Sequence, residues 1–195
     1  MCNDYERVIR WAEYRALMEA LELGVPADET ERDLPASAST RITDTAPVMR
    51  TRGNVVALSP MRWSWPAPGS GKPVFNFRSD NRRFRKEERV LIPASAFFEY
   101  VGARSPKTKY RFTLKDTPIL AIAGIWKPAA QDRPEAFTML TTEPGADIAP
   151  YHDRQVVVVP PGRWADWLYG DRPEAELCQP LPAGSLRVEA VRRGS

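Results

Sequence analysis

Apolar residues near the N-terminus recur at the spacing of one helical turn. They are Val8, Trp11, Tyr14, Leu17, Met18 and Leu21, a series that places one apolar face along a helix. Gly24 and Pro26 follow at once and are typical helix-ending residues. The pattern therefore predicts a helix over residues 6–23.

The next segment, residues 25–40, reads VPADETERDLPASAST and has no apolar period, so it predicts a surface loop. Beyond it, short β-branched and aromatic runs alternate with turn residues. They occupy residues 54–63, 89–94, 109–114, 118–126, 136–142, 155–160 and 186–191. We expect each of these seven runs to form a strand.

A short helix is predicted over residues 161–170, PGRWADWLYG, which has Pro at its start and Gly at its end. Many short strands with few helices favour an α+β fold, in which a curled antiparallel sheet or open barrel carries peripheral helices. The length of 195 residues suits one domain spanning residues 1–195.

Composition narrows the class of protein. Hydrophobic residues make up 43% and charged residues 27% of the chain, as in ordinary globular proteins. The longest apolar runs fall far short of the roughly 20 residues that cross a bilayer, and the N-terminus lacks a secretory signal pattern. We therefore expect a cytoplasmic protein with no membrane partner. The net charge of +3 permits a nucleic-acid partner without demanding one.

Cysteine and histidine are scarce. With only Cys2, Cys178 and His152, the chain has no disulfide framework and no convincing metal-ligand set. We expect no structural metal and no cofactor. Cys178 lies in the polar stretch RPEAELCQP, and nothing in the sequence gives it a function.

The position of Cys2, directly behind Met1, offers unusual chemistry. Methionine aminopeptidases remove Met1 when the next side chain is small, and Cys2 then carries both an α-amine and a thiol. The amine has a pKa near 8 and the thiol near 8.5, so both are usable near neutral pH. The amine can form a Schiff base with an aldehyde, and the thiol can close onto the imine carbon as a thiazolidine. The alternative is that Cys2 is simply a small buried residue.

Several stretches, in this order, resemble one family. They are MC at 1–2, SPMRW at 59–63, NFRSD at 76–80, PASAFFEY at 93–100, AGIW at 123–126 and YHDRQVVVV at 151–159. Together they resemble the SOS-response-associated peptidase (SRAP) family, which includes proteins that crosslink to abasic DNA. The resemblance extends from Cys2 to about Leu168.

The resemblance implies a function in the DNA-damage response. Cys2 is expected to form a thiazolidine with the ring-opened sugar of an abasic site in single-stranded DNA, with lyase activity arising from the Schiff base. The implied catalytic residues are Cys2, Asn76, Glu99 and His152. Asn76 is expected to orient the reacting groups, Glu99 to donate a proton from an apolar setting, and His152 to shuttle protons.

The residues expected to bind DNA surround these positions. They are Arg62, Trp63, Arg78, Thr141 and Arg154, of which the arginines are expected to contact phosphates and the tryptophan to stack on a base. Without the resemblance, Arg78 reads as a solvated surface charge, Glu99 as a strand glutamate facing water, and Thr141 as an ordinary strand threonine.

This chain departs from the family pattern at several places. Family members commonly begin Met-Cys-Gly-Arg, whereas Asn3 and Asp4 stand here, so an acid replaces an expected phosphate-binding arginine. A tryptophan often found shortly before the Asn motif is absent from APGSGKPVF, and Gln155-Val156 replaces the usual Met-Pro. The chain is thus expected to be a divergent member.

Two other functions remain open from the sequence. One is a thiol peptidase that uses Cys2 as nucleophile, His152 as base and Asn76 to orient the base. The other is a noncatalytic single-stranded DNA-binding module. In each case we expect a monomer.

Overall fold

The structure is a computed structural model that describes residues 2–24, 36–131, 133–170 and 172–192. Strands make up 45% and helices 14% of the described residues. The strands are β1 (Asp4–Arg7), β2 (Ser37–Arg41), β3 (Thr45–Arg52), β4 (Val55–Trp63), β5 (Trp65–Pro66), β6 (Pro73–Val74), β7 (Asn76–Arg78), β8 (Arg89–Ala94), β9 (Ala96–Val101), β10 (Thr108–Leu114), β11 (Leu120–Lys127), β12 (Ala136–Thr142), β13 (Gln155–Val156), β14 (Val158–Val159) and β15 (Leu186–Arg192). The helices are α1 (Trp11–Ala20), α2 (Trp164–Leu168) and α3 (Glu174–Leu177), with 3₁₀ turns η1 (Lys86–Glu88) and η2 (Pro161–Arg163).

Five strands close into a barrel. β4 pairs with β3, β3 with β8, β8 with β11, and β11 with β12, all antiparallel, and β12 returns to β4 in parallel. Gly124 allows the close approach at one seam, because a Cβ there would lie 2.6 Å from Ile92 Cδ1 and 2.7 Å from Thr138 O. Closure removes the free sheet edges that an open sheet would expose.

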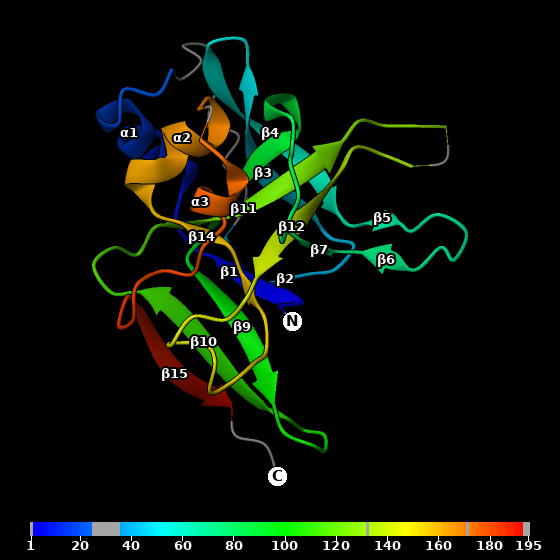
Figure 1. Ribbon diagram of the computed structural model, residues 1–195, viewed down its shortest axis with the longest axis vertical. Helices are drawn as coiled ribbons and strands as arrows, with labels where there is room; N and C mark the ends of the chain where they lie inside the picture. The colour runs from blue at the N-terminus through cyan, green and yellow to red at the C-terminus, as the bar shows by residue number, and fades with distance from the viewer. Residues whose placement is uncertain (1, 25–35, 132, 171, 193–195) are drawn as a thin grey trace.

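A second sheet, in the order β15-β10-β9-β1-β2, stands against the barrel (Figure 1). The chain passes from one sheet to the other between β8 and β9, at Ser95. There the Ser95 N–H donates to the carbonyl of Glu6, and its hydroxyl donates to the Glu6 carboxylate at 2.8 Å. β1 is thereby held inside the second sheet, between β9 and β2.

The barrel strands β8 and β11 are buried on both faces over all or most of their length, which explains their nearly continuous apolar sequences. In β8, Leu91 packs into one core cluster, while Val90 and Ile92 pack into the other. The first cluster lies under the helices, where Trp167 Nε1 donates to the carbonyl of Val90 at 2.9 Å. The second contains Cys2, whose position is therefore fixed by packed side chains.

All three helices lie on the same side of the barrel (Figure 1). Tyr14 of α1 donates its hydroxyl to the carbonyl of Ala94 at 2.7 Å, which ties the helix to β8. No helix among the described residues has the length and apolar character that crossing a membrane requires.

The sequence predictions are confirmed for the seven strand runs, although residues 155–160 form two short strands, β13 and β14. The expected helix over residues 161–170 appears as η2 followed by α2. The α+β architecture with curled sheets is also confirmed, although β12 runs parallel to β4 and β7, so the barrel is not wholly antiparallel.

The predicted bounds of the N-terminal helix and of the loop that follows it are wrong. The helix expected over residues 6–23 is confined to 11–20, because residues 4–7 pair with β9 and β2 as a strand. The loop expected over residues 25–40 ends in β2, which begins at Ser37, and its residues 25–35 lie outside the described part. In both cases long-range strand pairing overrides the local pattern.

Candidate functional site

Three of the expected catalytic residues meet at the start of the chain. Asn76 Nδ2 donates to the main-chain carbonyl of Cys2 at 2.7 Å. The main-chain N–H of Cys2 donates to the carboxylate of Glu99. The two polar groups of the Cys2 main chain are therefore each held by a side chain from a different sheet.

Strand register positions these side chains. β7 runs parallel to β12, with Asn76 beside Met139, and this pairing fixes the amide at the barrel edge. Glu99 lies opposite Tyr110 in the β9–β10 ladder. The Glu99 side chain points into the protein and is only 1% exposed, so the alternative of a water-facing strand glutamate is wrong.

The Cys2 thiol is buried and only 1% exposed, and its Sγ donates to the carbonyl of Asp4 at 3.2 Å. Burial, together with the negative charge of Glu99, raises the pKa of this thiol to about 12. The sulfur is therefore protonated at neutral pH, and it is not a preformed thiolate nucleophile.

Burial also raises the pKa of Glu99 to about 7, and the charge of Asp153 acts in the same direction. The hydrogen bond from the Cys2 N–H favours the ionised form and opposes this shift. A carboxyl with a pKa near 7 can both hold and release a proton under physiological conditions, as a general acid–base group must.

His152 lies on the turn that follows Tyr151. Its Nδ1 accepts the N–H of Arg154 at 3.0 Å and lies 2.8 Å from Asp153 Oδ1. The first contact needs Nδ1 without a hydrogen and the second needs an Nδ1–H, so the two contacts belong to different tautomers or protonation states of the ring. Burial lowers the pKa of His152, and the nearby positive charge of Lys107 contributes to this shift.

Arg154 is engaged within the protein. Its guanidinium forms a two-point ion pair with Asp80, at 3.2 and 2.6 Å, and donates to the carbonyl of Thr141 at 2.8 Å. Thr141 is itself buried in β12. These contacts connect the NFRSD stretch to the His152 turn, and a DNA contact by either residue remains a prediction.

Trp63 does not offer a surface for base stacking. Its ring is fully buried, stacks on Phe137 and donates through Nε1 to the carbonyl of Phe75 at 2.9 Å. The expectation that Trp63 contacts DNA is wrong in this conformation, because its ring faces are covered by the core. Arg62 and Arg78, by contrast, are exposed.

Sequence reasoning missed a buried polar cluster at Asp4. Its carboxylate accepts hydrogen bonds from Lys109 at 2.7 Å, Tyr100 at 2.9 Å and Ser39 at 2.8 Å. These partners lie 35 to 105 residues away in the chain, and no local pattern links them. The ion pair with Lys109 balances the charge of Asp4.

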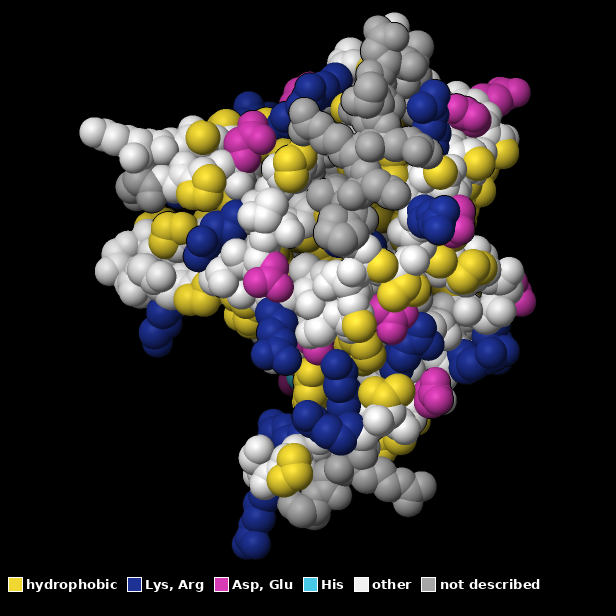
Figure 2. Space-filling model, turned by 180° about the vertical axis from the view of Figure 1, so that it is seen from behind, with side chains coloured by type: hydrophobic (Ala, Val, Ile, Leu, Met, Phe, Trp, Pro, Cys, Tyr) yellow, Lys and Arg dark blue, Asp and Glu magenta, His cyan; other side chains and the backbone are white. Residues whose placement is uncertain are grey.

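Lysine and arginine side chains also gather on the surface of the second sheet, on the face seen from behind, with acidic side chains among them (Figure 2). One such pair on this sheet joins Arg111 to Glu6 at 2.6 Å. Mixed charges of this kind are typical of a solvated face.

Known relatives align with between 51% and 69% of this chain. It is 27% identical over 155 residues to abasic site processing protein YoqW of Bacillus subtilis, covering 69% of each chain. It is also 25% identical over 108 residues to abasic site processing protein YMR114C of Saccharomyces cerevisiae, covering 51% of this chain and 29% of the yeast protein.

Solved structures share the fold. A crystal structure of a protein from Bordetella bronchiseptica matches with a TM-score of 0.72 at 25% identity, covering 98% of this chain and 100% of the other. One from Bacteroides thetaiotaomicron matches with a TM-score of 0.70 at 15% identity, covering 98% and 92%. The family model for SOS response associated peptidase (SRAP) matches residues 1–194. The chain therefore belongs to the SRAP family.

Proposed function

We propose that this protein processes abasic sites, and that Cys2, once Met1 is removed, captures the abasic sugar covalently in single-stranded DNA. The relatives from Bacillus subtilis and Saccharomyces cerevisiae are named abasic site processing proteins. One observation carries the finer proposal. The Cys2 nitrogen, which becomes the α-amine after processing, lies against the Glu99 carboxyl, while Asn76 holds the Cys2 carbonyl.

The proposed reaction proceeds in two steps. The α-amine of Cys2 attacks the C1′ aldehyde of the ring-opened sugar to give a carbinolamine, which loses water to give an imine. The thiol then adds to the imine carbon, its proton passes to the nitrogen, and a thiazolidine forms. No oxidant or reductant is needed.

Glu99 is suited to the dehydration step. Its pKa of about 7 leaves a substantial fraction protonated at neutral pH, so it can donate a proton to the departing hydroxyl. The buried Oδ1 of Asn76 has no hydrogen-bond partner among the described residues. That oxygen is an acceptor for the new amine or a sugar hydroxyl, since buried polar atoms are normally paired.

The protonation state of Cys2 favours the amine as first nucleophile. A thiol with a pKa of about 12 contributes almost no thiolate at pH 7, whereas a thiol peptidase depends on a thiolate. In the proposed sequence the sulfur reacts only after the imine carbon is electrophilic. We therefore favour abasic-site capture over the peptidase alternative.

Intact-mass analysis tests the proposal. Protein purified without Met1 is incubated with a single-stranded oligonucleotide containing one abasic site, and its mass is measured before and after. We expect a stable adduct of the protein mass plus the oligonucleotide mass, less one water. Strand cleavage products on a denaturing gel report lyase activity of the imine.

Substitutions at the two cysteines provide matched controls. Cys178→Ser removes a cysteine buried in the other core cluster and should leave the adduct intact. Cys2→Ser and Cys2→Ala both retain the α-amine but lack the thiol, so each should give only an imine adduct that borohydride traps. A stable adduct with Cys2→Ser, or none with the processed wild type, contradicts the proposal.

A further inference from the structure

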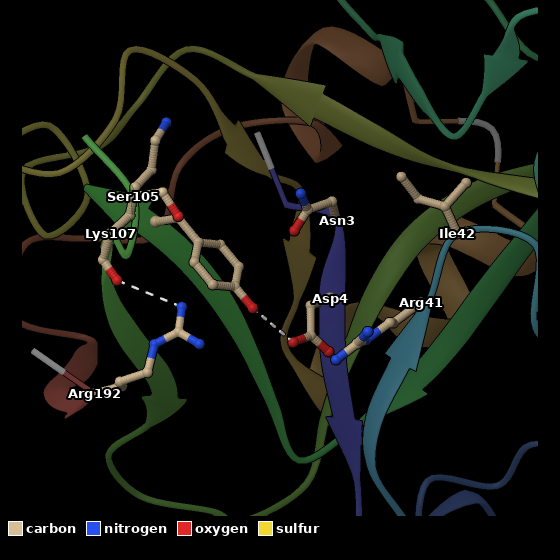
Figure 3. A pocket seen from close by; sticks show the side chains of 8 residues that line it. Asn3, Asp4, Arg41, Ile42, Ser105, Lys107 and Arg192 are labelled. Atoms are coloured by element: carbon tan, nitrogen blue, oxygen red, sulfur yellow. Dashed lines mark hydrogen bonds between the residues drawn. The ribbon is translucent and has the colours of Figure 1, made fainter. Parts of the chain in front are cut away.

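A cavity of about 600 Å³ lies beside β1, next to the proposed nucleophile. Its wall includes Asn3 and Asp4 from the start of the chain, Arg41 from the end of β2, Tyr100 from β9, Lys107 and Arg192. Figure 3 shows Lys107 and Arg192 on one side of β1 and Arg41 on the other. Tyr100 also lines the cavity and donates its hydroxyl to the carboxylate of Asp4 at 2.9 Å.

The cavity carries net positive charge. Asp4 is the only acidic residue in its lining, and the Asp4 carboxylate already accepts hydrogen bonds from Lys109 and Tyr100. Arg41 Nε is 3.3 Å from Ser39 Oγ, and Arg192 Nη2 is 3.4 Å from the carbonyl of Lys107, both long contacts to neutral oxygens. Within the described residues, no carboxylate forms an ion pair with the side chain of Arg41, Lys107 or Arg192.

The cavity adjoins the reacting groups. Asn3 and Asp4 directly follow Cys2, and Lys107 is close enough to His152 for its charge to lower the pKa of that ring. Tyr110, on the strand that follows Lys107, packs against Tyr151 at 4.6 Å between ring centroids. A strand held at Cys2 can therefore continue into this cavity.

We propose that this cavity binds the backbone phosphates of a DNA strand on one side of the captured sugar, through Arg41, Lys107 and Arg192. This inference rests on the proposed function. Asp4 stands where an arginine is expected to bind phosphate, and an acid cannot make that contact. In this proposal the three basic residues, which lie outside the family motifs, bind the phosphates instead. The half-buried Tyr100 ring adds an aromatic wall, and cations combined with an aromatic surface are typical of single-strand binding. An acidic peptide would not require that wall beside Cys2.

Two triple variants with the same loss of charge test the assignment. One is Arg41→Ala/Lys107→Ala/Arg192→Ala. The control is Arg10→Ala/Lys115→Ala/Arg187→Ala, which removes three positive charges outside this cavity, two of them near the opposite end of β1. Affinity for an undamaged single-stranded oligonucleotide is measured from 50 to 200 mM salt.

We expect the cavity variant to bind about tenfold more weakly at 50 mM salt. Its slope of log affinity against log salt should decrease in magnitude by about 2, because each single-strand phosphate contact contributes about 0.7. The control should change the slope by less than about 0.5. Equal losses for the two variants would overturn the proposal, as would an unchanged affinity accompanied by loss of binding to an acidic peptide.

Abasic oligonucleotides extended on only one side of the lesion separate this inference from the proposed function. The cavity variant should lose adduct-forming rate with one extension and not with the other, because the cavity lies on one side of Cys2. Equal effects on both overturn the inference alone. Failure of the wild type to form any adduct overturns the proposed function. In that case the salt dependence of binding to the undamaged strand still tests whether the cavity binds DNA.

Discussion

The amide of Asn76 donates a 2.7 Å hydrogen bond to the main-chain carbonyl of Cys2, across 74 residues of sequence. This bond joins the edge of the barrel to the first residues of the second sheet. It holds the carbonyl of Cys2, while Glu99 accepts the N–H of the same residue. The geometry of the proposed nucleophile is thus set by the packing of two sheets, which leads to the following predictions.

Asn76→Ala should slow adduct formation by at least tenfold, because the α-amine loses its fixed orientation. The free energy of unfolding should fall by only about 1 kcal/mol, the usual value of one hydrogen bond. Adduct formation is followed by intact mass against time, and stability by urea unfolding. Asn54→Ala, in an exposed turn, is the control and should change neither. A variant that loses stability but keeps the wild-type rate contradicts the orienting role.

The raised pKa of Glu99 predicts that the rate of adduct formation depends on pH. Its pKa is raised to about 7 by burial, so the protonated form is present below pH 7 and is lost above it. The attacking α-amine, with a pKa near 8, becomes more available as pH rises, so if Glu99 donates the proton the wild-type rate should first rise with pH and then show a downward step once the Glu99 carboxyl is ionised. Glu99→Gln should be slower and should lack this step. The measurement is the initial rate from pH 5.5 to 8.5, and an identical pH profile in both proteins contradicts the assignment.

The raised pKa of Glu99 also predicts that the free energy of unfolding depends on pH. The folded pKa of about 7 exceeds the ordinary value of 4.5, so the folded state holds a proton that the unfolded state releases between these two values. Wild-type stability should therefore decrease relative to Glu99→Gln as pH rises from 4.5 through 7. Urea unfolding at pH 5 and pH 8 measures this difference. A wild-type stability that rises relative to Glu99→Gln between pH 5 and pH 8 would show that the pKa is not raised.

Lys109→Met should destabilise the protein by about 2 kcal/mol, because it leaves the buried carboxylate of Asp4 without its counter-charge. Asp4→Asn/Lys109→Met should recover part of this loss. The control is Arg15→Met, which breaks the exposed Arg15–Glu19 pair and should cost less than about 0.5 kcal/mol. Urea unfolding compares the four proteins. Equal costs for Lys109→Met and Arg15→Met would contradict a buried pair.

Trp63→Phe should reduce stability by about 2 kcal/mol, because it leaves a void and removes the hydrogen bond to the Phe75 carbonyl. Since the ring is fully buried, the affinity of the folded protein for single-stranded DNA should stay within twofold of wild type. Thermal unfolding and strand binding are measured side by side. A large loss of affinity without loss of stability would restore Trp63 to the DNA-binding surface.

Much of this protein could be predicted from its sequence. Apolar and β-branched runs such as 89–94 and 136–142 predicted the barrel strands, because a segment buried on both faces carries few charged side chains and is largely apolar. The ordered motifs around Cys2, Asn76, Glu99 and His152 indicated the family. Local chemistry alone raised the idea that a terminal cysteine carries two nucleophiles.

The tertiary structure decided what depends on contacts distant in sequence. Residues 4–7 form a strand because β9 and β2 pair with them. Trp63 is buried because the rings of Tyr5, Phe75 and Phe137 pack around it. The negative charge of Asp4 is balanced by Lys109, which lies 105 residues later in the chain. Burial and charge pairing are properties of a residue's surroundings in space, so the pKa of Glu99, the protonation of Cys2 and the basic cavity beside them emerge only when the two sheets pack.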